Sequence, residues 1–372
     1  MKDFFASLKD DLIMTDRLML GCAVMLSLWG VFCIYSAAAG TSGRGFDYAM
    51  KQAAWLVVSI LAMLLVMVFG HHKFLEGAYP LFGLMLLMLL LTDLLAPKVK
   101  GAQSWIGVGG IRFQPSEFAK IAIILMMSKF LSRYPPLDFK TFSAGLGVIM
   151  LPVVLVLIQP DAGSALVYMV ISFGMLLAAG TPMKYLGGLV GLGIAAGPLM
   201  YFFLLKDYQR NRILVFFDPM RDPLGAGYNV IQSRIAVGSG GLAGKGFMMG
   251  TQSKLKFLPE PHTDFIFSVF SEEFGFIGNL LLVFLFGLLL YRVILAGTRS
   301  RDRRSKILVA GVASWLWFQT VESIGMSIGF TPVTGLPLPF LSYGGSSLLA
   351  TFMALGLVAS VYVEGTSNGR RF

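Results

Sequence analysis

The sequence FLPEPHTDFIFSVFSEEFG, at residues 257–275, places acidic side chains at the start of a strongly apolar segment and inside it. Its titratable residues are Glu260, His262, Asp264, Glu272 and Glu273. Charged groups at membrane depth are costly and usually mark function. Asp264 stands where an apolar helix begins, so it could act as a general base at a cavity mouth, with Glu260 beside it. The alternative is structural, because Thr263 or Asp264 could cap the helix.

Glu272 and Glu273 lie two turns deeper in the same apolar segment. Adjacent residues diverge by about 100° around a helix, so both cannot share the face of Asp264. We interpret them as structural polar contacts inside a helix bundle. Asp93 and Glu322 receive the same interpretation.

The stretch QPSEFAK, at residues 114–120, begins another helix and carries Glu117 and Lys120. Residues three apart are neighbours on one helical face. The pair could be an ion pair that fastens a helix end, or it could line a polar cavity.

The stretch QPDAGS, at residues 159–164, separates two apolar runs. Asp161 could cap the second run or face the same cavity. The segment LPLPFLSYGGSS, at residues 336–347, enters the last apolar run and adds Ser342 as a candidate cavity residue.

The stretch DYQRNR, at residues 207–212, contributes Arg210 and Arg212. Guanidinium groups bind phosphate well, but basic residues beside a membrane also contact lipid head groups. The glycine-rich stretch GSGGLAGKGF, at residues 238–247, lacks the spacing and the final Ser or Thr of a phosphate loop. A tight turn is the better interpretation.

The elements that must position these residues are apolar helices. The chain has 372 residues, of which 56% are hydrophobic and 13% charged, whereas soluble domains carry about a quarter charged residues. Runs of about 20 apolar residues are long enough to cross a bilayer. The sequence predicts an all-α polytopic membrane protein, one domain over residues 1–372. The ten predicted spans are 18–38, 52–70, 75–96, 117–132, 142–158, 162–180, 184–205, 263–291, 307–330 and 344–364.

Positive charge in short loops predicts the orientation, because Lys and Arg favour the cytoplasmic side. The basic loop at 299–306 contrasts with the sparse loop at 39–51, which places both termini in the cytoplasm. The large loop 206–262, between spans seven and eight, is then extracytoplasmic. The connections 97–116, 159–161 and 331–343 join it on the outer face, so the candidate polar residues converge there. The net charge of +10 arises from basic residues that mostly lie in loops, where they set the topology. No nucleic-acid-binding motif is visible.

Several long sequence blocks, in order, resemble the SEDS family of bacterial shape, elongation, division and sporulation proteins. The blocks are KGAQSWIGVGGIRFQPSEFAKIA (100–122), IQPDAGSAL (158–166), DYQRNRI (207–213), DPLGAGYNVIQSRIAVGSGGLAGKGF (222–247), GTQSKLKFLPEPHTDFIF (250–267) and PVTGLPLPFLSYGGSS (332–347). The segments RFQPSE and GKGFMMGTQS are more similar to the elongation branch than to the division branch. The family pattern has Asn before IGM, where this chain has Ser323 preceded by Glu322. We expect this departure to affect only the contacts of span nine and not the outer cluster.

The resemblance implies a peptidoglycan glycosyltransferase in the inner (cytoplasmic) membrane. Such enzymes polymerise lipid II on the outer face and release undecaprenyl pyrophosphate. The family's essential aspartate matches Asp264. Its other cavity residues match Glu117, Lys120, Asp161, Glu260 and Arg210. The resemblance also implies a divalent cation, Mg²⁺ or Mn²⁺, and a partner transpeptidase, a class B penicillin-binding protein.

Two other functions fit parts of the pattern. A transporter that flips a lipid-linked precursor would also carry charges among broken helices, although it needs polar groups at mid-depth. A scaffold for a transpeptidase would not need carboxylates at a lipid-exposed mouth. Candidate residues gathered at one face favour the enzyme.

Overall fold

The computed structural model describes residues 14–42, 44–95, 105–108, 111–203 and 207–369, and these are mostly helical. The helices are α2 (Arg17–Ser42), α3 (Gly45–Phe69), α4 (His71–Glu76), α5 (Ala78–Leu95), α6 (Pro115–Arg133), α7 (Phe139–Ile158), α8 (Ala162–Ala178), α9 (Met183–Phe203), α10 (Asp207–Phe217), α11 (Ala226–Ser239), α12 (Thr251–Lys254), α13 (Ile266–Arg299), α14 (Arg303–Ile328) and α15 (Gly345–Gly369), with one 3-10 turn, η1 (Pro219–Arg221). A short antiparallel hairpin, β1 (Ile106–Val108) with β2 (Ile111–Phe113), precedes α6.

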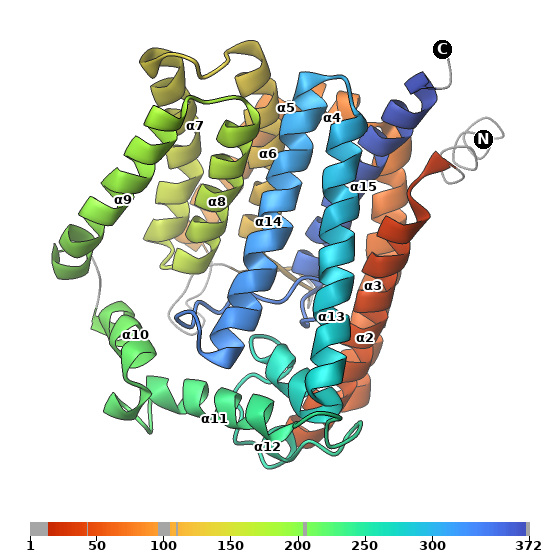
Figure 1. Ribbon diagram of the computed structural model, residues 1–372, viewed down its shortest axis with the longest axis vertical. Coiled ribbons are helices and arrows are strands. Elements are labelled where there is room, and N and C mark those ends of the chain that lie inside the picture. Colours follow the sequence, from red (N-terminus) through yellow and green to blue (C-terminus); the bar gives the residue numbers. More distant parts are fainter. Residues whose placement is uncertain (1–13, 43, 96–104, 109–110, 204–206, 370–372) are drawn as a thin grey trace.

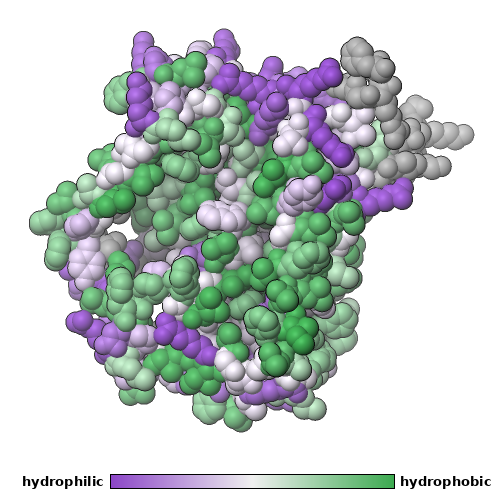
Figure 2. All heavy atoms as spheres, in the orientation of Figure 1, coloured by the Kyte–Doolittle hydropathy of each residue, from purple (hydrophilic) through white to green (hydrophobic). Residues whose placement is uncertain are grey.

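The helices form the polytopic membrane bundle that the apolar runs predict. Within the described residues, seven helices are long and apolar enough to cross a membrane, namely α2, α3, α7, α9, α13, α14 and α15. The apolar helices α5 and α8 are shorter. Figure 2 shows a broad apolar belt, with hydrophilic residues gathered mainly at the upper end and along part of the lower end. The number of ten spans stays a prediction.

Small residues let the central helices approach closely, as in other membrane bundles. A Cβ at Gly356 of α15 would lie 2.6 Å from the Met63 carbonyl oxygen of α3. A Cβ at Gly174 of α8 would overlap the Ser314 side chain of α14. By contrast, α9 lies at the edge of the bundle (Figure 1), and its Ile194 side chain is 73% exposed.

Helix α13 differs from the predicted span 263–291. It begins at Ile266, ends at Arg299 and is broken at Gly275, whose φ is 66°. A Cβ at Gly275 would lie 2.2 Å from the Gly244 backbone nitrogen. The backbone N–H of Phe276 donates to the Gly241 carbonyl, which replaces a hydrogen bond lost at the break. The glycine-rich stretch at 238–247 is therefore a packed turn against α13.

The two ends of the bundle carry different elements. The start of α2, the short α4 and the end of α15 lie at one end, which is uppermost in Figure 1. Helices α10, α11 and α12, which belong to the segment 207–262, lie at the other end. The candidate residues are distributed around the loop between α14 and α15, whose contacts are described next.

Candidate active site

Asp264 lies in a turn two residues before α13 and is partly exposed. The N-cap residue of α13 is Phe265, and its side chain makes no capping hydrogen bond. Thr263 and Asp264 therefore do not occupy the cap position that the capping alternative gave them. A Cβ at Gly335 would lie 3.6 Å from Asp264 Oδ2, so the carboxylate faces the loop between α14 and α15.

The turn that carries Asp264 is held from two sides. The backbone N–H groups of Thr263 and Phe265 donate to the Glu260 carbonyl, at 3.3 and 3.4 Å. The Ser342 hydroxyl donates to the Thr263 carbonyl at 2.7 Å and accepts from the Leu338 N–H at 2.8 Å. In this structure, Ser342 therefore joins the α14–α15 loop to the Asp264 turn.

Residues of α3 support the same junction, and sequence reasoning missed them. Gln52 is buried, and its side chain donates to the Ser342 carbonyl and accepts from the Gly344 N–H, both at 3.2 Å. The Tyr48 ring lies 4.9 Å from the His262 ring and 5.0 Å from the Tyr343 ring. A buried glutamine in an apolar helix was the available signal, since buried polar groups need partners.

Glu117 and Lys120 form the predicted pair. Lys120 Nζ lies 2.9 Å from Glu117 Oε2, and both side chains are buried, with 1% and 3% exposure respectively. The same ammonium donates to Gln319 Oε1 at 3.2 Å and lies 4.4 Å from the centre of the Trp315 ring. A buried ion pair persists only when further contacts satisfy it, and Gln319 and Trp315 supply those contacts.

Gln319 connects this ion pair to the α14–α15 loop. Its Oε1 accepts from Trp315 Nε1 at 2.6 Å, and its Nε2 donates to the Pro337 carbonyl at 2.7 Å. Sequence reasoning also missed this residue, although it stands out as an amide that follows the largely apolar middle of α14.

Asp161 caps α8, as one of its two interpretations expected. Its carboxylate accepts from the Ser164 N–H at 3.0 Å and from the Ser164 hydroxyl at 2.7 Å. Burial raises the pKa of Asp161, the Ser164 hydrogen bonds oppose this, and the nearby charges of Glu117 and Lys120 act with smaller effect. Asp161 therefore lies within electrostatic range of the Glu117–Lys120 pair while it caps α8.

The start of α8 also adjoins the α14–α15 loop. A Cβ at Gly163 would lie 3.2 Å from the Thr334 carbonyl oxygen and 3.2 Å from the Leu336 side chain. Loop residues 334–336 thus adjoin both the Asp264 turn and the start of α8, which Asp161 caps.

Glu322 contacts the α14–α15 loop, although we expected it to affect only the contacts of span nine. Its Oε1 accepts from the Thr334 hydroxyl at 3.0 Å, and its backbone carbonyl accepts from the Thr331 hydroxyl at 3.3 Å. Thr334 directly precedes Gly335, which lies beside Asp264. The expectation that residues 322–323 leave the outer cluster untouched is therefore wrong, because α14 ends beside that cluster.

The two arginines have different positions. Arg212 Nη1 donates to the Val333 carbonyl at 3.3 Å, which brings one cation to the loop. Arg210 instead donates to the carbonyls of Tyr201 and Phe202 at the end of α9, at 2.9 and 2.8 Å. Of the two predicted arginines, Arg212 contacts the α14–α15 loop and Arg210 contacts the end of α9.

Glu272 has the structural role that was expected of it. Its fully buried carboxylate accepts from Lys245 Nζ at 2.6 Å, from the Thr251 N–H at 2.8 Å and from the Gln252 N–H at 3.2 Å. Glu273 accepts a hydrogen bond from the Ser36 hydroxyl of α2. The Glu272 contacts fasten residues 245–252 to α13, and the Glu273 contact joins α13 to α2.

The donor chemistry around Asp264 fits the implied divalent cation. Mg²⁺ and Mn²⁺ prefer oxygen ligands, and Mg²⁺ is commonly held by one or two carboxylates together with substrate phosphates. The Asp264 turn offers a partly exposed carboxylate on a segment that also carries the exposed Glu260. In chemical terms, the site combines a candidate base with two cations, Arg212 and Lys120, arranged around one loop.

Known proteins are similar to this chain over nearly its whole length. A family model described as "Cell cycle protein" and covering FtsW, RodA and SpoVE matches residues 16–367. The chain is 39% identical over 353 residues to the peptidoglycan glycosyltransferase MrdB of Escherichia coli K12, covering 94% of this chain and 95% of that protein.

Solved structures are similar over nearly the whole chain. A chain from a study of polymerisation and crosslinking by a peptidoglycan synthase complex is 31% identical, with a TM-score of 0.81, and the match covers 94% of this chain and 98% of that one. The crystal structure of RodA, a rod shape determining protein of Thermus thermophilus, is 30% identical, with a TM-score of 0.71 and coverage of 94% and 96%.

Proposed function

Because the chain belongs to the FtsW, RodA and SpoVE family and is a peptidoglycan glycosyltransferase of cell elongation, we propose that it polymerises lipid II with Asp264 as general base. The observation that carries this assignment is the position of Asp264. Asp264 lies outside the cap position of α13, which Phe265 occupies, and its carboxylate faces the α14–α15 loop. Every other predicted cavity residue except Arg210 is on the Asp264 turn or linked to this loop.

The reaction joins a sugar hydroxyl to an anomeric carbon. A hydroxyl is a poor nucleophile, so Asp264 takes its proton as the new carbon–oxygen bond forms. The bond from the anomeric carbon to the pyrophosphate breaks, and undecaprenyl pyrophosphate leaves with the electron pair. The leaving group gains negative charge, which fixed positive groups stabilise. Arg212 at Val333 is the placed cation that can approach it.

A divalent cation, when bound, would supply further positive charge at the leaving pyrophosphate. Asp264 and Glu260, with substrate oxygens, are the residues that would hold it. Asp161 and the Glu117–Lys120 pair are linked to the same loop through the start of α8 and through Gln319, and they would orient the substrate or the loop itself.

Both substrates are lipid-anchored, so the site must lie where the bilayer meets the extracytoplasmic solvent. The start of α2 and the end of α15 lie at the same end of the bundle, together with the basic connection at 299–306 (Figures 1 and 2). The positive-inside rule supports a cytoplasmic position for that end. The segment 206–262 and Asp264 would then face outward from the cytoplasmic membrane.

A class B penicillin-binding protein is the proposed partner. The support is the similarity to a chain studied in a peptidoglycan synthase complex that coordinates polymerisation with crosslinking. Such a transpeptidase would crosslink the strands that this chain makes.

Purified protein, incubated alone with lipid II and Mg²⁺, tests the proposal. Glycan strands should form, and chelation of the metal should stop their growth. Folded protein that makes no strands, alone or with the transpeptidase, would leave the scaffold function in place of the enzyme. Movement of lipid II across vesicle membranes without polymerisation would instead support the transporter.

A further inference from the structure

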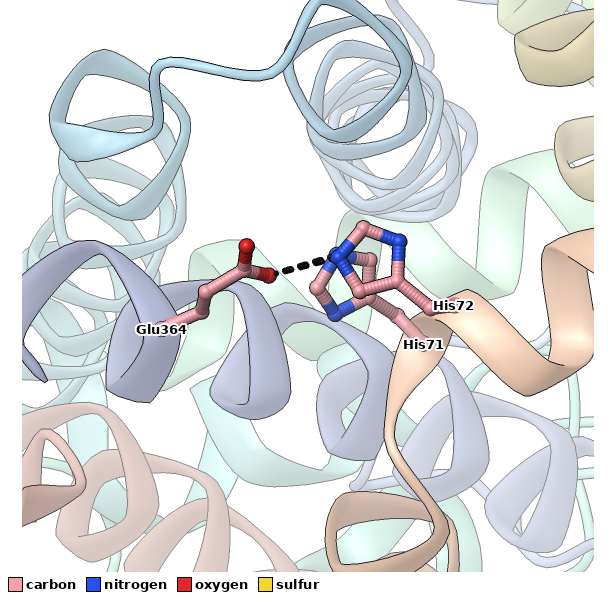
Figure 3. Close-up of side chains that lie close together, drawn as sticks. All are labelled: His71, His72 and Glu364. Atoms are coloured by element: carbon pink, nitrogen blue, oxygen red, sulfur yellow. Dashed lines mark hydrogen bonds and ion pairs between the residues drawn. The ribbon is translucent and has the colours of Figure 1, made fainter. Parts of the chain in front are cut away.

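A group of three side chains with metal-ligand spacing lies at the end of the bundle where α15 ends. The group consists of His71, His72 and Glu364. Their potential ligand atoms all lie within 4.8 Å of one another, and it is the group of this kind found among the described residues. His72 Nε2 lies 2.9 Å and His71 Nε2 3.3 Å from the same oxygen, Glu364 Oε2. Figure 3 shows the two imidazoles of α4 and the carboxylate of α15 pointing toward one another.

His71 is held in a fixed position. Its side chain is 1% exposed, and Ser360 Oγ lies 2.9 Å from its Nδ1. Metal-bound histidines usually donate the other ring N–H to such a partner, which orients the ring. The Ser360 contact therefore orients the His71 ring as a metal ligand requires.

His71 Nε2 faces two oxygen atoms, Ser305 Oγ and Glu364 Oε2. Ser305 Oγ lies 2.9 Å from this nitrogen, and the Ser305 hydroxyl donates to Asp302 Oδ2 at 3.0 Å. When Ser360 accepts the Nδ1 proton, the Nε2 lone pair of His71 therefore faces the hydroxyl oxygen of Ser305 and the Glu364 carboxylate. A cation bound between these atoms would accept their lone pairs and balance the charge of the Glu364 carboxylate.

The other two ligands are accessible. His72 is 51% exposed and Glu364 is 38% exposed, so an ion can enter from solvent. Glu364 also belongs to the C-terminal part of α15, where the helix dipole favours a cation.

We propose that His71, His72 and Glu364 bind one divalent transition-metal ion of the zinc class. Two imidazoles and one carboxylate suit Zn²⁺, whereas Mg²⁺ and Mn²⁺ prefer oxygen ligands. Water can complete the coordination. The ion would crosslink α4 to the end of α15, next to the start of α14. This site lies at the opposite end of the bundle from α10–α12 and is separate from the cation proposed at Asp264.

Full-length protein without a polyhistidine tag, purified in detergent and freed of metal, allows a direct test. Co²⁺ titration should produce visible d–d absorption that saturates at one ion per chain, and Zn²⁺ should displace it. His72→Ala and Glu364→Gln should each weaken Co²⁺ binding at least about tenfold, as expected when a ligand is lost. Both changes are at exposed positions, so the fold should survive, and thermal melting checks this.

Two controls separate this site from others. Glu76→Gln removes an exposed carboxylate from the same short helix and should leave Co²⁺ binding unchanged. Asp264→Asn should also leave it unchanged, so a failure of the proposed base would not affect the result. Zn²⁺ should raise the melting temperature of the original protein and not that of His72→Ala.

Two results would overturn the proposal. One is folded protein that binds no Co²⁺ at micromolar to millimolar concentration. The other is binding that persists unchanged in both His72→Ala and Glu364→Gln. In either case the three side chains form a hydrogen-bonded contact between α4 and α15 and nothing more.

Discussion

At the residue scale, Asp264 illustrates how a capping explanation can be separated from a catalytic one. An aspartate just before a helix is ordinarily explained by the cap it provides. Here the cap position belongs to Phe265, and the carboxylate faces Gly335 of the α14–α15 loop. A structural reason for the residue type is therefore weaker than the sequence suggested.

We expect Asp264→Asn to lower the polymerisation rate by about 10²- to 10⁴-fold, because the amide cannot accept the proton. The rate with lipid II measures this, with melting temperature as a check on folding. Asp138→Asn is the matched control, since Asp138 caps α7 and asparagine caps equally well. Near-normal glycan synthesis by folded Asp264→Asn protein would show that Asp264 is not the general base. Partial recovery at high Mn²⁺ would assign Asp264 to the metal instead.

The buried ion pair gives a second prediction at this scale. Lys120→Met leaves the Glu117 carboxylate buried without its cation, which typically costs about 3–5 kcal/mol. Exchanging the two residues should not restore stability, because a carboxylate at position 120 would face Gln319 Oε1. Thermal melting and polymerisation rates measure both effects. Lys140→Met, at an exposed lysine of α7, is the control. Full recovery in the exchanged variant would show that only the charge pair matters.

At the element scale, the α14–α15 loop connects the two polar clusters. Thr334 bonds to Glu322, Pro337 accepts from Gln319, and Ser342 bonds to the Asp264 turn. A shift of this loop would therefore move groups on both sides of the site.

We predict that Thr334→Val lowers kcat about 10- to 100-fold, because small misplacements near reacting groups have effects of this size. Thr334→Ser keeps the hydroxyl and should retain most activity. Steady-state kinetics with lipid II distinguish the variants, and melting temperature reports on folding. If Thr334→Val has the original kinetics and stability, the bond to Glu322 does not position the loop.

The break in α13 is a second feature at the element scale. Gly275→Ala places a methyl group 2.2 Å from the Gly244 nitrogen, at a φ of 66° that disfavours alanine. We expect a loss of at least about 1–3 kcal/mol of stability. Gly287→Ala, in the same helix with open space around its Cβ, should be neutral or stabilising. Equal melting temperatures for the two variants would show that the break tolerates a side chain.

At the scale of the whole molecule, the direction of insertion decides where the chemistry occurs. Cysteine at Leu255, which is 62% exposed in the segment before Asp264, should react with an impermeant thiol reagent added outside spheroplasts. Cysteine at the exposed Arg304 should react only after lysis. The native Cys22 and Cys33 are buried, which keeps the background low. The reverse labelling pattern would invert the topology and exclude an outward-facing site.

The amino-acid sequence by itself determined the membrane class, the helices and most of the candidate residues. Hydrophobic length and helix propensity are local properties, so apolar runs give helices wherever they occur. Charged residues are rare in such runs. Each of Glu117, Lys120, Asp161 and Asp264 could therefore be recognised individually as a candidate site residue.

Only the tertiary structure decided which of these residues lie together. The bond from Gln319 to Pro337, the bond from Glu322 to Thr334 and the bond from Ser342 to Thr263 all depend on the α14–α15 loop folding back. Arg210 and Arg212 lie two residues apart and yet bond to different elements. Such contacts depend on how helices cross and where each one ends. A change of one residue in a helix boundary moves a side chain by about 100° around the axis, and local sequence does not specify boundaries that finely.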